Sequence, residues 1–165
     1  MIIKFREISF DTSRYFPISI EELLEVESQL GFSFPEDYRA FVTTLGAGET
    51  NICIHAFAPK DVRRYGDENC ERFAYHWFWT DSPDILTKER ALECLPFFDS
   101  YVGDDIIFHP DDPNRWFILP HEATHIYVVS SFRELVSHYC PYEDDEQNID
   151  SIFEFEGWSM ADLEG

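Results

Sequence analysis

The chain has 165 residues, of which 44% are hydrophobic and 17% aromatic, enough for one domain with a packed core. Its 33 acidic and 12 basic residues give a formal net charge of −21. A field this acidic repels nucleic-acid phosphates and anionic membrane surfaces, and it attracts a basic partner. Composition therefore predicts neither a nucleic-acid-binding nor a membrane-binding protein. The acidic residues serve either a basic partner or solubility alone.

The N-terminal part of the sequence predicts a pair of helices. Residues 1–10 are compatible with an opening strand or an irregular arm. A capping box begins at Ser19 and predicts a helix that ends at Gly31, a residue suited to a left-handed helix stop. Pro35 is a good first-turn residue, and a second helix is expected from there to Gly46.

The middle of the chain predicts alternating strands and helices. Residues 51–57 have the composition of a strand, and residues 59–65 suit one or two helical turns. The aromatic run at 73–79 predicts another strand, because aromatic side chains suit a pleated surface. Ser82 and Pro83 then predict the start of a helix that continues to about Leu95.

The late elements are a hairpin and a helix. Residues 106–109 and 116–119 flank the turn sequence PDDPN and predict two paired strands. A second capping box begins at Ser131, and apolar residues at helical spacing follow it as far as Tyr139. This pattern predicts a helix.

His121, Glu122 and His125 match the H-E-x-x-H signature of zinc hydrolases. Such a site needs a helix, so that both histidines share one face, with the glutamate as general base. Pro120 precedes the motif directly, and short strand-like runs flank it on both sides. The sequence therefore predicts a polar turn with exposed histidines and no metal, and a zinc hydrolase is the minor alternative.

Four cysteines are present, and none forms a C-x-x-C pair. Charged residues interrupt the apolar N-terminal run, as no secretory signal would allow. We expect a cytoplasmic protein with reduced thiols. No nucleotide fingerprint, phosphate loop or nucleophile elbow is present, so no cofactor and no catalytic residue are predicted.

The segment after residue 142 alternates acidic and aromatic residues, and it predicts an acidic extension (143–165) that follows a main domain (1–142). Aromatic residues beside acids are natural anchors for a basic partner, although core packing and turn chemistry explain many of them equally well. The candidate partner-binding residues are Asp104, Asp105, Asp111, Asp112, Glu143, Asp144, Asp145, Glu146, Trp77, Trp79 and Trp158.

Several short motifs occur in a characteristic order between residues 18 and 140. They include L-G at the end of the first helix, P-x-D-Y and a phenylalanine in the second, G-D before a strand, and S-F-x-x-L in the last helix. This series resembles the SUKH superfamily of Smi/Knr-type proteins. The chain departs from the pattern at "LGAG", where the family usually has an asparagine, and residues 58–94 have no counterpart. The matching positions are Leu30, Gly31, Pro35, Asp37, Tyr38, Phe41, Gly103, Asp104, Ser131, Phe132 and Leu135.

The resemblance implies an α+β fold, with a mixed twisted sheet, flanking helices and an N-terminal helix pair. It also implies a binding function, because many bacterial members are immunity proteins that block a cognate toxin. Many such toxins are nucleases with basic clefts, which suits an acidic protein. A regulatory or adaptor scaffold of the same fold is the alternative, and the zinc hydrolase is the third. No catalytic residue carries over.

Overall fold

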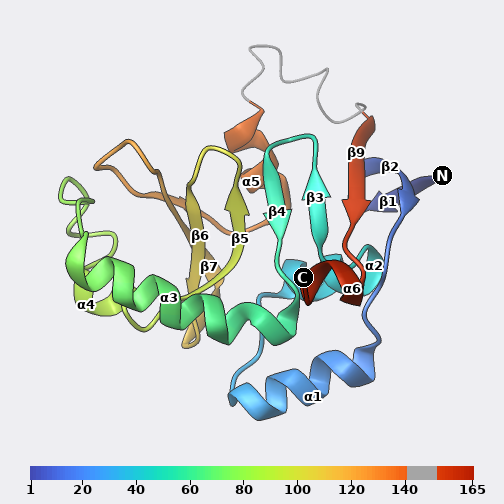
Figure 1. Ribbon diagram of the computed structural model, residues 1–165. Coiled ribbons are helices and arrows are strands. Elements are labelled where there is room, and N and C mark those ends of the chain that lie inside the picture. Colours follow the sequence, from blue (N-terminus) through green and yellow to red (C-terminus); the bar gives the residue numbers. More distant parts are fainter. Residues whose placement is uncertain (141–151) are drawn as a thin grey trace.

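A computed structural model describes residues 1–140 and 152–165. These residues form one nine-stranded sheet in the order β1-β2-β9-β3-β4-β5-β6-β7-β8 (Figure 1). The β2–β9 pair is parallel and the other pairs are antiparallel, which makes the sheet mixed, as predicted. The strands are β1 (Ile2–Phe5), β2 (Ile8–Arg14), β3 (Gly48–Thr50), β4 (Ile54–Ala56), β5 (Leu95–Ser100), β6 (Asp105–His109), β7 (Asp112–Leu119), β8 (Tyr127–Val129) and β9 (Ile152–Gly157).

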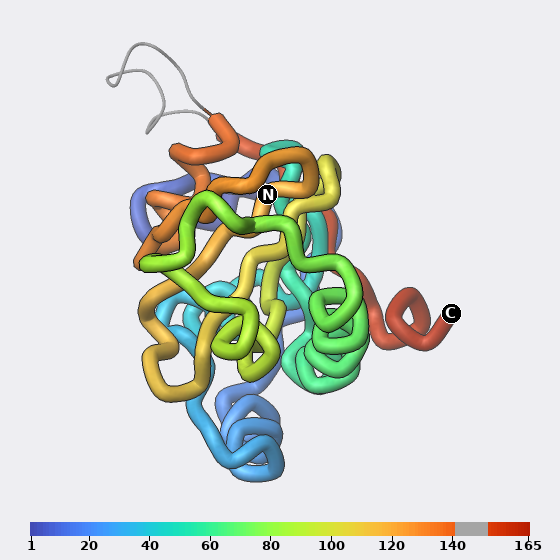
Figure 2. The backbone as a smooth tube through the Cα atoms, turned by 90° about the vertical axis from the view of Figure 1, so that its left-hand side faces the viewer, coloured from blue at the N-terminus to red at the C-terminus, as the bar shows by residue number. Residues whose placement is uncertain are grey.

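Helices combined with a mixed, mostly antiparallel sheet confirm the α+β class, and the helices lie on both sides of this sheet. In the side view of Figure 2, α3 and α6 lie on one side of the molecule and α5 lies on the other. Within residues 1–140 and 152–165, no helix has the length and the hydropathy that are needed to cross a bilayer. The helices are α1 (Ile20–Leu30), α2 (Glu36–Thr44), the 3₁₀ turn η1 (Pro59–Asp61), α3 (Val62–Tyr75), α4 (Lys88–Ala91), α5 (Phe132–Tyr139) and α6 (Met160–Leu163).

The main core lies between α2, α5 and one face of the sheet. The ring of Phe41 on α2 lies 4.9 Å from that of Phe132 on α5 and 5.8 Å from that of Phe155 on β9. Tyr38 is fully buried, and its hydroxyl donates to the carbonyl of Phe57 at 2.6 Å. Tyr38 and Phe41 are therefore core residues where the second helix packs on the sheet, as predicted.

A second cluster covers part of the opposite face. Phe73 on α3 packs there with Ile107 on β6 and Phe117 on β7. In Figure 1, α3 crosses the end of the sheet that carries β5 to β7 and does not reach β9 or β2. This face is therefore covered over one half and open over the other.

The local helix signals are confirmed. The Ser19 side chain accepts from the Glu22 amide, and Gly31 ends α1 with a φ of 79°. The Ser131 side chain accepts in the same way at the start of α5. The predicted hairpin is β6 and β7. Residues 1–10 contain β1 and the start of β2, so the strand alternative holds.

The strand predicted at 73–79 is wrong. Residues 73–75 end helix α3, and 76–79 form no strand. The aromatic rings pack on one another, with Phe73 and Trp79 5.3 Å apart and Trp77 and Trp79 5.1 Å apart. A dense aromatic run needs buried surface rather than a pleat, and here α3 and the second cluster supply it.

The helix predicted from Ser82 to about Leu95 is also wrong in extent. Only α4 is helical, and it is capped by Thr87, while Leu95 already begins β5. The Ser82 hydroxyl is buried and accepts from the Ile126 amide at 2.9 Å instead. The strand predicted at 51–57 is shorter, because residues 51–53 turn the chain between β3 and β4.

Strand β9 comes from the predicted C-terminal extension, and it lies inside the sheet between β2 and β3. The approach to β3 is very close at Gly48, where an added Cβ would lie 2.3 Å from the carbonyl oxygen of Glu156. The extension therefore completes the sheet by joining its N-terminal hairpin to the other strands.

Candidate functional site

A row of ionisable side chains crosses this side of the sheet, from its open half to the half that α3 covers. Glu156 on β9 pairs in register with Glu49 on β3, which pairs with His55 on β4. His55 pairs in turn with Asp99 on β5, and Asp99 with Asp105 on β6. Residues that face each other directly on neighbouring strands project to the same side of the sheet. The row therefore belongs to one surface.

A second acidic pair widens this surface. Asp11 on β2 pairs with Glu154 on β9. Both line a hollow of about 650 Å³ together with Glu49, Glu156 and Tyr101. We call the five carboxylates on this open region the acidic sheet face, which consists of Asp11, Glu49, Asp99, Glu154 and Glu156.

The acidic sheet face remains negative after its internal contacts are counted. In the part of the chain that the structure describes, two fixed cations approach it. Arg14 lies 3.8 Å from Glu156, and the N-terminal amine lies 2.8 Å from Asp11. Tyr101 donates to Glu49 at 2.5 Å, and this bond raises the pKa of the tyrosine to about 12.

His55 is the base nearest to these acids. Its Nδ1 lies 2.6 Å from Asp99 and its Nε2 lies 3.7 Å from Glu49. An aspartate–histidine pair activates a nucleophile only when a hydroxyl or thiol reaches the other ring nitrogen. The buried Nε2 has no hydrogen-bond partner among the described residues. The geometry is that of a histidine held between carboxylates rather than of a hydrolytic triad.

Trp158 is the predicted contact residue that the fold brings to this region. It follows β9 directly, is half-buried, and its ring lies 5.8 Å from that of His55. The His55 ring also packs on Tyr101 at 4.2 Å. Two aromatic side chains therefore border the acidic sheet face.

Asp104 and Asp105 differ from the carboxylates of the acidic sheet face because they are buried, with only 7% and 8% of their surface exposed. Asp104 accepts from the His121 amide at 2.8 Å and from the Tyr139 hydroxyl at 2.7 Å. Arg72 donates to Asp105 at 2.6 Å. Burial raises the pKa of Asp105, and Arg72 opposes that rise. Both carboxylates are engaged inside the protein.

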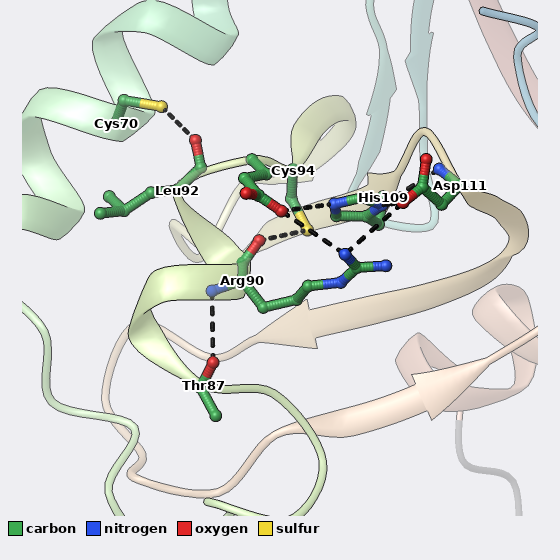
Figure 3. Close-up of polar contacts among 8 residues, drawn as sticks. Cys70, Thr87, Arg90, Leu92, Cys94, His109 and Asp111 are labelled. Atoms are coloured by element: carbon green, nitrogen blue, oxygen red, sulfur yellow. Dashed lines mark hydrogen bonds and ion pairs between the residues drawn. The ribbon is translucent and has the colours of Figure 1, made fainter.

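Asp111 and Asp112 lie at the opposite end of β6 from Asp104 and Asp105. Both are exposed at the β6–β7 turn. The Asp111 carboxylate lies 3.6 Å from Arg90, beside the buried ring of His109 (Figure 3). This contact links the turn to α4. The two aspartate pairs therefore do not form one surface.

Trp77 and Trp79, which belong to the strand predicted at 73–79, lie instead in the connection after α3. Trp79 is 3% exposed and its indole nitrogen donates to the carbonyl of Pro120 at 2.9 Å, so it belongs to the core. Trp77 is half-buried. The acidic run Glu143, Asp144, Asp145 and Glu146 lies outside the described residues.

The H-E-x-x-H stretch is a turn, as predicted, and it connects β7 to β8 without a helix. The His125 ring lies 3.2 Å from the Ser82 hydroxyl, while the His121 ring packs against Gly103. Within residues 1–140 and 152–165, no group of three or more potential ligands is placed to hold a metal ion. The residues present do not fit the zinc alternative.

Sequence reasoning did not select the members of the acidic sheet face. One signal was visible, because Phe153 and Phe155 alternate with Glu154 and Glu156, which is the pattern of a half-exposed strand. The rest depended on pairing across the sheet. Glu49 and Glu156 are far apart in the chain, and only their register makes them neighbours.

The comparisons with known proteins bear on the fold and the family. The family model described as "SMI1 / KNR4 family (SUKH-1)" matches residues 17–138, well over half of the chain. No curated protein and no solved structure matches the chain significantly.

Proposed function

Because the chain belongs to the SMI1/KNR4 family (SUKH-1), we propose that it is a non-catalytic binding protein that neutralises a basic protein toxin. The acidic sheet face is the surface assigned to that partner. The observation that carries the proposal is the pairing of Glu49 with Glu156, two like charges directly opposite on neighbouring strands.

Like charges in this position destabilise a sheet, since their Cβ atoms are about 5 Å apart. Asp11 and Glu154 repeat the arrangement on the next strand pair. Arg14 and Tyr101 each contact only one member of the Glu49–Glu156 pair. Cations of a bound protein would remove this repulsion. The free energy that the repulsion costs in the free protein would then contribute to the affinity of the complex.

The nature of the partner follows from charge. A formal net charge of −21 accelerates encounter with a basic protein and disfavours acidic ones. A nuclease toxin has a basic cleft because it binds phosphates. A sheet surface that presents carboxylates on adjacent strands can occupy such a cleft and exclude the nucleic acid.

The test begins with a search for a gene next to this one that encodes a toxin-like domain, and it uses that domain in purified form. Binding is followed by stopped-flow fluorescence across a salt series. The triple variant Glu49→Gln, Glu154→Gln, Glu156→Gln should lower the association rate constant about tenfold and weaken its salt dependence. The control variant neutralises Glu21, Glu22 and Glu25, three exposed acids of α1, and so matches the change in charge.

Protection is measured in parallel, as survival of cells that express the toxin domain. Wild type and the control variant should protect, and the triple variant should not. An equal loss in both variants would show that total charge matters and the acidic sheet face does not. The absence of a toxin-like neighbour, or binding without protection, would overturn the immunity role and favour an adaptor of the same fold.

A further inference from the structure

A second hollow, of about 470 Å³, lies on the same side of the sheet as the acidic sheet face. We call it the aromatic hollow. Its walls include the rings of Trp77, Phe78 and Trp79, and the imidazoles of His76 and His121 also line it. Phe78 is 38% exposed although it is a large apolar side chain. The wall therefore offers aromatic surface to solvent.

The aromatic wall is fixed before any partner binds. Phe78 stacks on Trp79 with ring centroids 4.2 Å apart, and Trp77 contacts Trp79 edge-on at 5.1 Å. Trp79 is held in turn by its hydrogen bond to Pro120. A preformed apolar wall loses little conformational entropy on binding, which is the property of an interface anchor site.

The charged groups of the aromatic hollow already neutralise each other. Asp105 accepts from Arg72 at 2.6 Å and lies 3.4 Å from the Asn69 amide. A cationic ligand would have to displace Arg72, and an anionic one would have to displace Asp105. The hollow therefore suits an uncharged apolar or aromatic group.

The aromatic hollow adjoins the acidic sheet face. The β5–β6 turn separates the two, since Tyr101 lines the acidic hollow and Gly103 lines the aromatic one. Asp99 of the acidic sheet face pairs in register with Asp105 of the aromatic hollow. A protein whose basic groups contact the carboxylates as far as Asp99 is therefore placed to extend side chains over this turn toward the aromatic hollow.

We propose that the aromatic hollow is the anchor site for an aromatic side chain of the basic toxin domain, inserted beside the cations that contact the acidic sheet face. This proposal rests on the proposed function, and it assigns association and dissociation of the complex to different residues. Acidic residues set the rate of association, and Trp77 and Phe78 set the lifetime of the complex.

The first experiment needs no toxin. N-acetyl-tryptophanamide and N-acetyl-argininamide are titrated separately against the ¹⁵N-labelled protein, and the indole N–H signals are followed by NMR. The tryptophan probe should shift Trp77 and Trp79, and it should leave the buried Trp116 unchanged. A response to the arginine probe alone, or to neither probe, would refute an aromatic anchor site.

The second experiment measures dissociation of the toxin complex. Trp77→Ala and Phe78→Ala should each raise the dissociation rate constant, by about thirtyfold for a hot-spot residue, with little change in association. Tyr75→Ala is the control, because Tyr75 is 84% exposed and does not line the hollow.

These outcomes separate the two proposals. Unchanged dissociation in both variants, with the wild type still bound, refutes the anchor site and leaves the proposed function intact. A wild type that does not bind the toxin refutes the proposed function, and the fragment titration then decides alone whether the hollow accepts an aromatic group.

Discussion

The two faces of strand β9 divide the molecule into a region that stabilises and a region that costs stability. Phe153 and Phe155 point into the main core, where the Phe155 ring lies 5.8 Å from that of Phe41. Glu154 and Glu156 point the other way, toward Asp11 and Glu49. The six-residue strand β9 therefore contributes apolar burial on one face and like-charge repulsion on the other.

This difference separates the residues whose identity is explained by folding from the residues whose identity folding does not explain. Burial of a phenylalanine is favourable on any strand, so the core face needs no further explanation. Opposed carboxylates lower the stability of the sheet and could be avoided by ordinary polar residues. The open face therefore supports the proposal of a basic partner, because folding alone does not account for its opposed carboxylates.

The largest expected effect is on the core face. Phe155→Ala should lower the free energy of unfolding by about 3–5 kcal/mol, because the side chain is 4% exposed and leaves a cavity. Urea denaturation followed by circular dichroism measures the change. A loss below about 1 kcal/mol would show that β9 contributes little to the main core and that the two faces differ less than we infer.

A smaller effect of opposite sign is expected one residue earlier. Glu154→Gln keeps the shape of the side chain and removes its repulsion with Asp11, so stability should rise by about 0.2–1 kcal/mol. The same urea titration measures it, with Glu25→Gln on α1 as a control for total charge. If Glu154→Gln destabilises the protein, the carboxylates of the acidic sheet face do not repel one another measurably. The main observation in favour of a basic partner then fails.

The smallest effect concerns the C-terminal helix α6, which borders the open face. Ser159 donates to Asp162 from its hydroxyl at 2.7 Å and from its amide at 2.6 Å. These bonds, with a smaller contribution from Arg14, hold the pKa of Asp162 below its ordinary value of 3.8. A lowered carboxyl pKa stabilises the folded state above the ordinary value, and this stabilisation is lost as the pH falls through the folded-state pKa.

Asp162→Asn should therefore destabilise the protein slightly at neutral pH, and the difference from wild type should shrink below about pH 4. Urea midpoints between pH 3 and pH 7 give the comparison, and Glu164→Gln at the end of α6 is the control. A difference that is constant over this range would mean that the capping geometry matters and the charge of Asp162 does not.

Much of the helical structure could be read from the sequence, because its signals are local. Ser19 and Ser131 cap helices through amides three residues away, and Gly31 ends α1 where its own left-handed conformation requires it. The turn at His121–His125 was likewise readable, since Pro120 excludes earlier helical turns and short strand-like runs flank the motif. Family membership followed from the order of such short motifs.

The sequence also determined the sign of the net charge, which does not depend on the fold and on which the proposal of a basic partner rests. Only the tertiary structure decided which acids face solvent. Asp104 and Asp105 are equivalent to Asp111 and Asp112 as dipeptides, yet the first pair is buried against Arg72, Tyr139 and a backbone amide. Glu49 and Glu156 became neighbours through a register set by β9, which enters the sheet from the far end of the chain. Capping depends on residues within one helical turn, whereas strand register and the burial of Asp104 and Asp105 depend on contacts between distant segments.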